Sequence, residues 1–343
     1  MGRRNRTYWM LFLILLLVIS MALGTSIGPV DIPLMDVLRI MLSGLPGLEG
    51  VSSGLPESSR TIVLDIRLPV VLMALFVGAG LSSSGAAMQG LFRNPLVDPF
   101  IIGISAGGAF GWVAGSLMTD GMTGQGAVIL RAFIAFAGAV GAVFAAYLIS
   151  RSGGRIPLAN LLLAGIAVSA FLTSATQLLI YLLIDDPATL IFSLMGSCAN
   201  SRWSELLIVA PVVVFGSLGL TVLGRDLNAL SSGEEEAKNL GVDVERKKTL
   251  LICLAAAVSA VSVPFCGMIG FVGLIIPHIV RRVSGPDHRF LVPASALLGA
   301  SFLIFSDLLS RTLIEVVIPL GIITGLAGGL FFIYLLVARR RSA

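Results

Sequence analysis

This sequence contains few charged residues. Charged side chains make up 12% of the 343 residues, against about 25% in an average soluble domain. The 23 basic and 19 acidic residues nearly balance, so the chain has no surplus positive charge for a polyphosphate partner. Only three cysteines occur, without the spacing of a disulfide framework or of metal ligands. These shortages exclude a soluble enzyme, a secreted disulfide scaffold, a disordered chain and a nucleic-acid binder.

Hydrophobic residues are what the sequence has in abundance. They make up 56% of the chain, and the mean hydropathy is +0.99. Since a helix needs about 20 apolar residues to cross a bilayer, the sequence predicts a single all-α polytopic membrane domain over residues 1–343. Ten spans are expected, near 8–28, 68–91, 100–118, 127–149, 159–184, 204–224, 249–265, 268–281, 292–312 and 319–338. The eighth is short and holds Pro277, which predicts a half-length or tilted helix.

Basic residues predict the orientation. Three arginines precede the first span and three follow the last, at 3–6 and 339–341, so both termini are expected in the cytoplasm. Ten crossings then place 17 of the 23 basic residues inside. The six left outside are Arg39, Arg60, Arg67, Arg131, Arg202 and Arg311. The first span has about 20 apolar residues, longer than the ~7–15 of a signal peptide, and is expected to be an uncleaved helix.

Glycines recur every fourth residue in two spans, at Gly103, Gly107, Gly111 and Gly115 and at Gly321, Gly325 and Gly329. We interpret both series as helix-packing surfaces rather than a pore lining. Polar residues inside the spans are few: Gln89, Gln177, Asp307 and His278. Asp307 stands four residues before Arg311, which predicts an ion pair. For His278 a structural role is favoured over metal binding, since no second ligand stands at a suitable spacing.

The chain has no phosphate-binding loop of the G-x-x-x-x-G-K-[ST] type. Its only lysines are Lys238, Lys247 and Lys248, and none follows a glycine in that setting. Any ATP-driven step must therefore come from another polypeptide, and the chain itself is not expected to be an enzyme. The alternative is an ion-coupled secondary transporter that works without an ATPase. That class needs coupling residues at the midplane and often internal repeats, neither of which is found here.

One soluble segment, 225–248, has 5 basic and 6 acidic residues in 24 positions. Ser231 or Ser232 is expected to N-cap a short helix with an acidic first turn at 234–236, ended by Gly241. A short turn over 226–230 would precede it. The segment reads either as an ordinary solvated loop or as a docking surface. If it is a docking surface, its apolar residues would contact the partner: Leu227, Leu230, Ala237 and Leu240.

Five segments together resemble the permease subunits of type II ABC importers, which take up iron–siderophore complexes, haem and cobalamin. They are IRLPVVLMALFVGAGLSSSGAAMQGLFRNPLVDPFIIGISAGGAFG (66–111), NLLLAGIAVSA (160–170), LSSGEEEAKNLGVDVERKK (230–248), GMIGFVGLIIPHIVRRVSGPDHRFLVPASALLGASFLIFSDLLSRT (267–312) and IPLGIITGLAGGLFFIYLL (318–336). The resemblance runs in order through nearly the whole chain from Ile66 onward.

The resemblance implies a homodimeric permease in the inner (cytoplasmic) membrane. Two ABC ATPase subunits would bind it on the inside and a substrate-binding protein on the outside, with no nucleic-acid partner. ATP and Mg would be bound by the ATPase, and the permease itself would need no cofactor. It would move a metal chelate (ferric siderophore, haem or cobalamin) by alternating access, although a smaller oxyanion such as molybdate also stays open.

The same resemblance assigns roles to particular residues. The ATPase-coupling loop would include Leu230, Gly233, Glu234, Glu235, Glu236, Ala237, Leu240 and Gly241. The cytoplasmic gate would be formed by Asn94, Pro95 and Leu96 together with Leu158 and Ala159, and the span that begins there would line the pathway. On the outer face, Arg67 and Arg311 would pair with acidic residues of the binding protein, which gives register and steering more than affinity.

Overall fold

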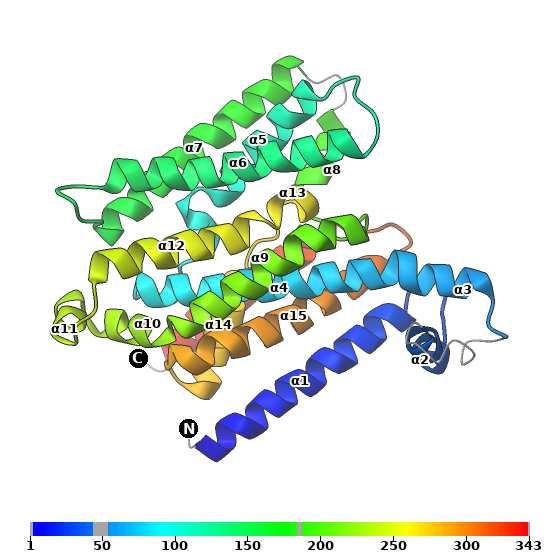
Figure 1. The fold of residues 1–343 in the computed structure, drawn as a ribbon, viewed down its shortest axis with the longest axis horizontal. Coiled ribbons are helices and arrows are strands. Elements are labelled where there is room, and N and C mark those ends of the chain that lie inside the picture. The colour runs from blue at the N-terminus through cyan, green and yellow to red at the C-terminus, as the bar shows by residue number, and fades with distance from the viewer. Residues whose placement is uncertain (1–2, 44–53, 184–186, 342–343) are drawn as a thin grey trace.

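The computed structural model describes residues 3–43, 54–183 and 187–341, which are predominantly helical (Figure 1). The helices are α1 (Arg3–Ser26), α2 (Leu34–Leu42), α3 (Glu57–Thr61), the π-helical η2 (Ile62–Arg67), α4 (Leu68–Leu91), the 3-10 turn η3 (Pro99–Ile102), α5 (Ile104–Met118), α6 (Gln125–Ser150), α7 (Leu158–Leu183), α8 (Pro187–Leu194), α9 (Trp203–Val222), α10 (Gly224–Ser232), α11 (Glu234–Asn239), α12 (Val244–Ala260), α13 (Val263–Cys266), α14 (Val272–Ser284), α15 (His288–Thr312) and α16 (Leu320–Arg341).

Seven helices within these described ranges are long and apolar enough to cross a membrane. They are Asn5–Ser26, Glu57–Leu91, Gln125–Ser150, Leu158–Leu183, Trp203–Val222, Val244–Cys266 and His288–Thr312. The remaining three predicted spans coincide with α5, α14 and α16. As expected for the eighth span, α14 has only 13 residues and contains Pro277. The structure thus confirms a polytopic helical protein.

Helix α4 lies at the centre of the bundle. Nearly all its residues from Pro69 to Leu91 are buried, because α9, α12, α14 and α15 all pack around it. Helix α1 runs along α15, while α5, α6 and α7 form a separate layer on the far side of α12 (Figure 1). The bundle has two ends, which we name the α11 end, with α10 and α11, and the α2 end, with α2, α3, α8 and α13.

Glycines set the closest helix contacts. A Cβ added to Gly85 of α4 would lie 1.8 Å from the carbonyl oxygen of Gly273 in α14, and one at Gly107 would lie 2.4 Å from that of Gly138 in α6. The first predicted glycine series is therefore a packing surface. The second series behaves differently: Gly321 packs against backbone, but a Cβ at Gly325 or Gly329 would meet nothing within 4 Å. This face of α16 is open in the isolated chain.

The polar residues of the predicted spans have structural partners. Asp307 and Arg311 form the predicted ion pair at 2.9 Å, with side chains 3% and 11% exposed. The Gln89 amide donates to the Leu274 carbonyl at 3.1 Å, which joins α4 to α14. The His278 ring packs edge-on against Phe331, with 5.6 Å between the centroids. Gln177 is exposed on α7.

Two cysteines that lie 68 residues apart in sequence meet at the α2 end. The Sγ atoms of Cys198 and Cys266 are 3.6 Å apart, and both residues are buried. The Ser197 amide donates to the Cys266 carbonyl at 2.9 Å, so the two segments are also joined through backbone. Spacing along the chain carries no sign of this contact.

We expect mild oxidation of a Cys253→Ser variant to link Cys198 to Cys266. The sulfurs need to approach by about 1.5 Å to reach disulfide distance. Copper–phenanthroline treatment followed by peptide mapping would show the link, and a Cys198→Ser control should remove it. After oxidation, the protein would be unfolded and its free thiols titrated. If two free thiols remain, this packing of the α8–α9 connection on α13 is wrong.

Candidate functional site

The charged loop folds into the two short helices α10 and α11, which project at the α11 end (Figure 1). Helix α11 opens with three glutamates, where carboxylates interact favourably with the helix dipole. It ends at Gly241, whose φ of +80° favours glycine. The predicted helix and its stop are confirmed.

The predicted serine N-cap is wrong. The residue that caps α11 is Gly233, and it makes no side-chain cap. Both serines instead lie in the last turn of α10, where the Ser231 and Ser232 hydroxyls bond back to carbonyls of their own helix, at 2.7 Å and 3.3 Å. The break between the two helices therefore falls one residue later than the cap pattern suggested.

The apolar residues of this segment do not form an outward docking face, contrary to that interpretation. Leu227, Leu230 and Ala237 are 0–2% exposed and belong to the main hydrophobic core, whereas Leu240 is 72% exposed. The surface left outside carries Glu235, Glu236, Lys238, Asn239 and Leu240. Burial of the apolar side fixes α10 and α11 against the bundle and turns the acidic side outward.

Helix α10 is bonded to the end of α4. The Arg93 Nε donates to the Leu230 carbonyl at 2.9 Å, and the Ser231 hydroxyl lies 3.1 Å from the Gly90 carbonyl. Arg93 adopts a φ of +51°, a left-handed conformation that ends α4 and starts the 94–98 turn. These two hydrogen bonds connect α10 to the start of this turn.

The residues predicted to form a gate lie in two segments at this same end. In the first, Asn94 Oδ1 accepts a hydrogen bond from the Leu96 amide at 3.0 Å, and Pro95 lies between them. In the second, Leu158 and Ala159 form the first turn of α7. Phe92, Arg93, Leu158 and residues 232–236 line one open depression of about 510 Å³. The structure thus brings the start of α7 and the end of α4 to the acidic turn.

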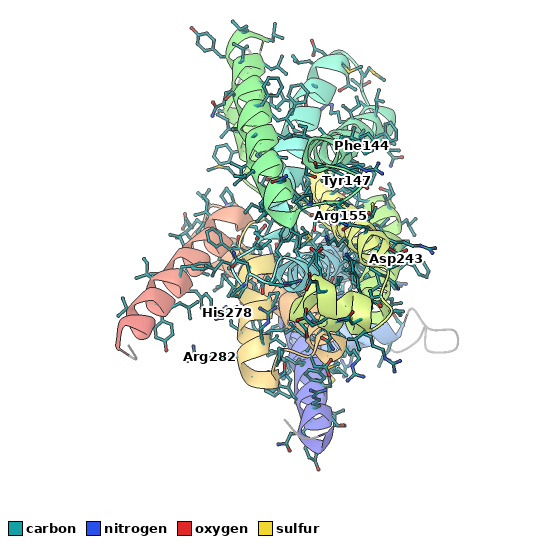
Figure 2. The ribbon with its side chains drawn as sticks, turned by 90° about the vertical axis from the view of Figure 1, so that its left-hand side faces the viewer. Phe144, Tyr147, Arg155, Asp243, His278 and Arg282 are labelled. Carbon is teal, nitrogen blue, oxygen red and sulfur yellow. The ribbon has the colours of Figure 1, made fainter. Side chains whose placement is uncertain are left out.

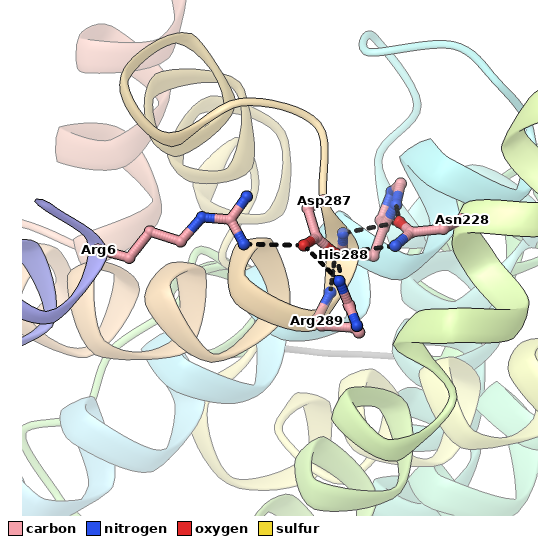
Figure 3. Close-up of polar contacts among 5 residues, drawn as sticks. All are labelled: Arg6, Asn228, Asp287, His288 and Arg289. Carbon is pink, nitrogen blue, oxygen red and sulfur yellow. Dashed lines mark hydrogen bonds and ion pairs between the residues drawn. The ribbon is translucent and has the colours of Figure 1, made fainter. Parts of the chain in front are cut away.

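A second polar cluster, which the sequence analysis missed, joins α10 to both α1 and α15 (Figure 3). The Asp287 carboxylate accepts hydrogen bonds from Arg6 and Asn228, both at 2.8 Å, and from Arg289 at 3.1 Å. The bonds from Arg289, Asn228 and Arg6 hold the pKa of Asp287 well below its usual range, against the opposing effect of burial. Asn228 Oδ1 also accepts from the His288 amide at 2.8 Å.

This cluster has no periodic signal in the sequence, because Arg6 and Asp287 are 281 positions apart. Both lie at helix ends, however, and Asp287 directly precedes α15 as its N-cap. The sequence signal for this cluster was an aspartate at a helix N-cap, Asp287, with Arg289 two residues later. The cluster attaches the middle of α10 to α1 and α15 through Asn228.

Arg67 and Arg311, the predicted docking residues, lie at the α2 end but point into the protein. The Arg67 side chain is 4% exposed, and its guanidinium donates to the carbonyls of Thr25, Ser26 and Val30. These carbonyls lie at and beyond the end of α1, where the helix leaves them without internal partners. The docking role stays a prediction, and in this arrangement both guanidinium groups are already bonded within the chain.

The structure is a many-helix membrane bundle with an acidic helical segment fastened to it at one end. Residues 13–338 match the FecCD transport family. The chain is 46% identical over 291 residues to the cobalamin import system permease protein BtuC of Halobacterium salinarum, which covers 84% of this chain and 77% of that protein. It is 40% identical over 284 residues to the hemin transport system permease protein HmuU of Yersinia pestis, with 82% and 84% covered.

A solved structure of a metal-chelate type ABC transporter in an inward-facing conformation is also similar, with a TM-score of 0.82. It is 33% identical, and the match covers 96% of this chain and 98% of that one. The chain belongs to the FecCD transport family. It is a multi-pass protein of the cell membrane and an ABC transporter permease, that is, a transporter component rather than a catalytic subunit.

Proposed function

We propose that this chain is the permease subunit of an ATP-driven importer that moves a metal chelate delivered by a substrate-binding protein. The observation that carries the proposal is the α10–α11 segment, which presents Glu235 and Glu236 outward while hydrogen bonds attach it to the end of α4. A docking ATPase could thereby act on the transport bundle. The ATP and Mg belong to that partner, and this subunit needs no cofactor of its own.

The proposed topology has ten crossings with both termini in the cytoplasm, so that the α11 end is the inner end. It is supported by helices at all ten predicted spans and by the 17 basic residues that this arrangement puts inside. The short helices α5 and α14 would cross within the bundle, and α16 would cross at its edge. The α2 end is then extracytoplasmic and receives the binding protein.

A homodimer is proposed because one side of the chain is unpartnered. Helix α16 stands away from the other helices in the view onto the α11 end, on the side where His278 and Arg282 lie (Figure 2). Gly325 and Gly329 of this helix have open space where a side chain would be. Faces of small residues like this one allow another helix to approach closely. A second copy would cover this face and complete the pathway.

The proposed pathway runs along α7. Exposed residues at near-heptad spacing form one stripe on this helix: Asn160, Ala167, Ser174 and Gln177. The same face also exposes Leu163, Phe171 and Tyr181, so it is mostly apolar and carries no charge. An uncharged lining suits a large chelate that makes few specific contacts. Asn94, Pro95 and Leu96 of the α4–η3 turn, with Leu158 and Ala159 of α7, would close its inner end.

The substrate class rests on the relatives. Those named above are permeases for cobalamin and for haemin, and the similar solved structure is of a metal-chelate type transporter. We therefore propose a metal chelate such as cobalamin, haem or a ferric siderophore. Selection among these is expected to reside in the binding protein, because the stripe of α7 contains no charge that would distinguish them.

The experiment is to co-express this permease with the ATPase subunit of its importer and to test whether the two purify together. We expect a stable complex whose ATP hydrolysis rises when the cognate binding protein is added, and a control without the permease should show no such rise. If the permease purifies alone under conditions that preserve its fold, or if the binding protein leaves hydrolysis unchanged, the proposed function is wrong.

A further inference from the structure

Lys248 is an unusually buried cation at the α11 end. It lies in α12 and is 1% exposed, although lysine is almost never fully buried unless it is paired. Its ammonium group donates hydrogen bonds to Glu245 Oε1 at 3.0 Å and to the Ile156 carbonyl at 3.2 Å. It also forms an ion pair with Glu234, whose Oε1 lies 2.7 Å away. Two carboxylates and a carbonyl therefore surround this buried charge.

The three partners of Lys248 come from three different segments. Glu234 is the first residue of α11, Glu245 lies in the first turn of α12, and Ile156 precedes α7 by two residues. Glu245 contributes a second bond to the same place, because its Oε2 accepts from the Ile156 amide at 2.9 Å. Both backbone polar groups of Ile156 are thus held by the Lys248–Glu245 pair, and Ile156 itself is 2% exposed.

The neighbouring lysine makes a contrasting contact. Lys247 pairs with Asp226 of α10 at 2.7 Å, and both side chains are partly exposed. That pair joins α12 to α10 and does not reach the segment before α7. Two adjacent lysines of one helix therefore attach it to two different parts of the loop, and only Lys248 also bonds the chain that leads into α7.

We propose that Lys248 is a positioning residue that ties the ATPase-docking helix α11 to the start of α7, so that a displacement of α11 moves Leu158 and Ala159. A buried cation deprived of its partners is strongly destabilising. Separation of α11 from residue 156 is therefore resisted, and the two segments move together. The inference rests on the proposed function and adds to it a specific connection between the docking site and the inner constriction.

The test uses the full complex with its ATPase in nanodiscs, with a reporter cysteine introduced by Ala159→Cys in a Cys253→Ser background. The measurement is the rate of maleimide labelling, with and without ATP plus vanadate. We expect nucleotide to change this rate by about fivefold or more in the parent, the lower end of usual coupling strengths. In Lys248→Met complexes that retain the ATPase, the change should fall below about twofold.

Two further variants make the test specific. Lys247→Met removes a neighbouring charge from the same helix and should keep the parent's nucleotide response. Glu234→Ala removes only the α11 partner and leaves Lys248 bonded to Glu245 and Ile156. In complexes that retain the ATPase it should lose the response as Lys248→Met does. Because Glu234 is partly exposed, this variant serves if Lys248→Met fails to fold.

The outcomes separate the two proposals. If the parent retains no ATPase, or shows no nucleotide effect at Ala159→Cys, the proposed function fails and this inference fails with it. If the parent responds and the Lys248→Met and Glu234→Ala complexes respond equally well, only the inference is overturned. An equal loss in Lys247→Met would also overturn it, since the connection would then not be specific to Lys248.

Discussion

The double substitution Glu235→Lys and Glu236→Lys is expected to abolish retention of the ATPase subunit while the permease stays folded. Both side chains are exposed in the first turn of α11. Reversal of two interfacial charges replaces attraction by like-charge repulsion, which costs several kcal/mol and corresponds to about a hundredfold or greater loss of affinity. Co-purification at low salt, with a thermal unfolding measurement on the permease alone, checks both parts.

A matched control reverses two exposed acids at the α2 end, Asp120→Lys with Glu315→Lys. The change in net charge is the same, but the substitutions lie far from α11, so ATPase retention should equal that of the parent. Equal retention in the Glu235→Lys, Glu236→Lys protein would show that the ATPase docks elsewhere. An equal loss in the control would show that net charge, not the α11 surface, governs the association.

Asp307→Ala is expected to produce the largest loss of stability, about 3–5 kcal/mol, because it leaves the buried Arg311 without its counter-charge. Arg311 also reaches the Gly24 carbonyl at 3.3 Å, so its displacement loosens α1 from α15. The measurement is unfolding of the purified protein in a fixed detergent, compared with the parent.

The informative control replaces the whole pair, Asp307→Leu with Arg311→Met. A buried ion pair exchanged for apolar residues of similar size is often neutral in stability, so the double variant should lie close to the parent. If it is as unstable as the sum of the single variants, the two side chains act independently and the ion pair is not the source of the stability.

Hydropathy could predict where the helices lie, because the bilayer imposes a minimum length of apolar residues on each crossing. The short apolar run with Pro277 predicted the short helix α14, and a spacing of four residues predicted the Asp307–Arg311 ion pair. These features are local: each depends on residues within one helix. The acidic turn and the Gly241 stop of α11 were predictable for the same reason.

What could not be predicted depends on contacts between distant segments. From the sequence, the apolar residues of the loop could form either an outer docking surface or part of the core. The packing of α10 and α11 on the bundle puts three of them in the core: Leu227, Leu230 and Ala237. Arg67 had the position of an outer docking residue, yet the unpaired carbonyls at the end of α1 draw its guanidinium inward. The network around Lys248 joins residues 92 positions apart.

Uptake by reconstituted proteoliposomes tests the central claim most directly. The permease, its ATPase and its binding protein would be reconstituted together, with ATP inside the vesicles beside the ATPase and cyanocobalamin, haemin or ferric citrate outside. An importer permease predicts uptake of one of these chelates that requires ATP and all three components. Uptake by this chain alone, driven by a proton or sodium gradient without ATP, would contradict it and establish a secondary transporter.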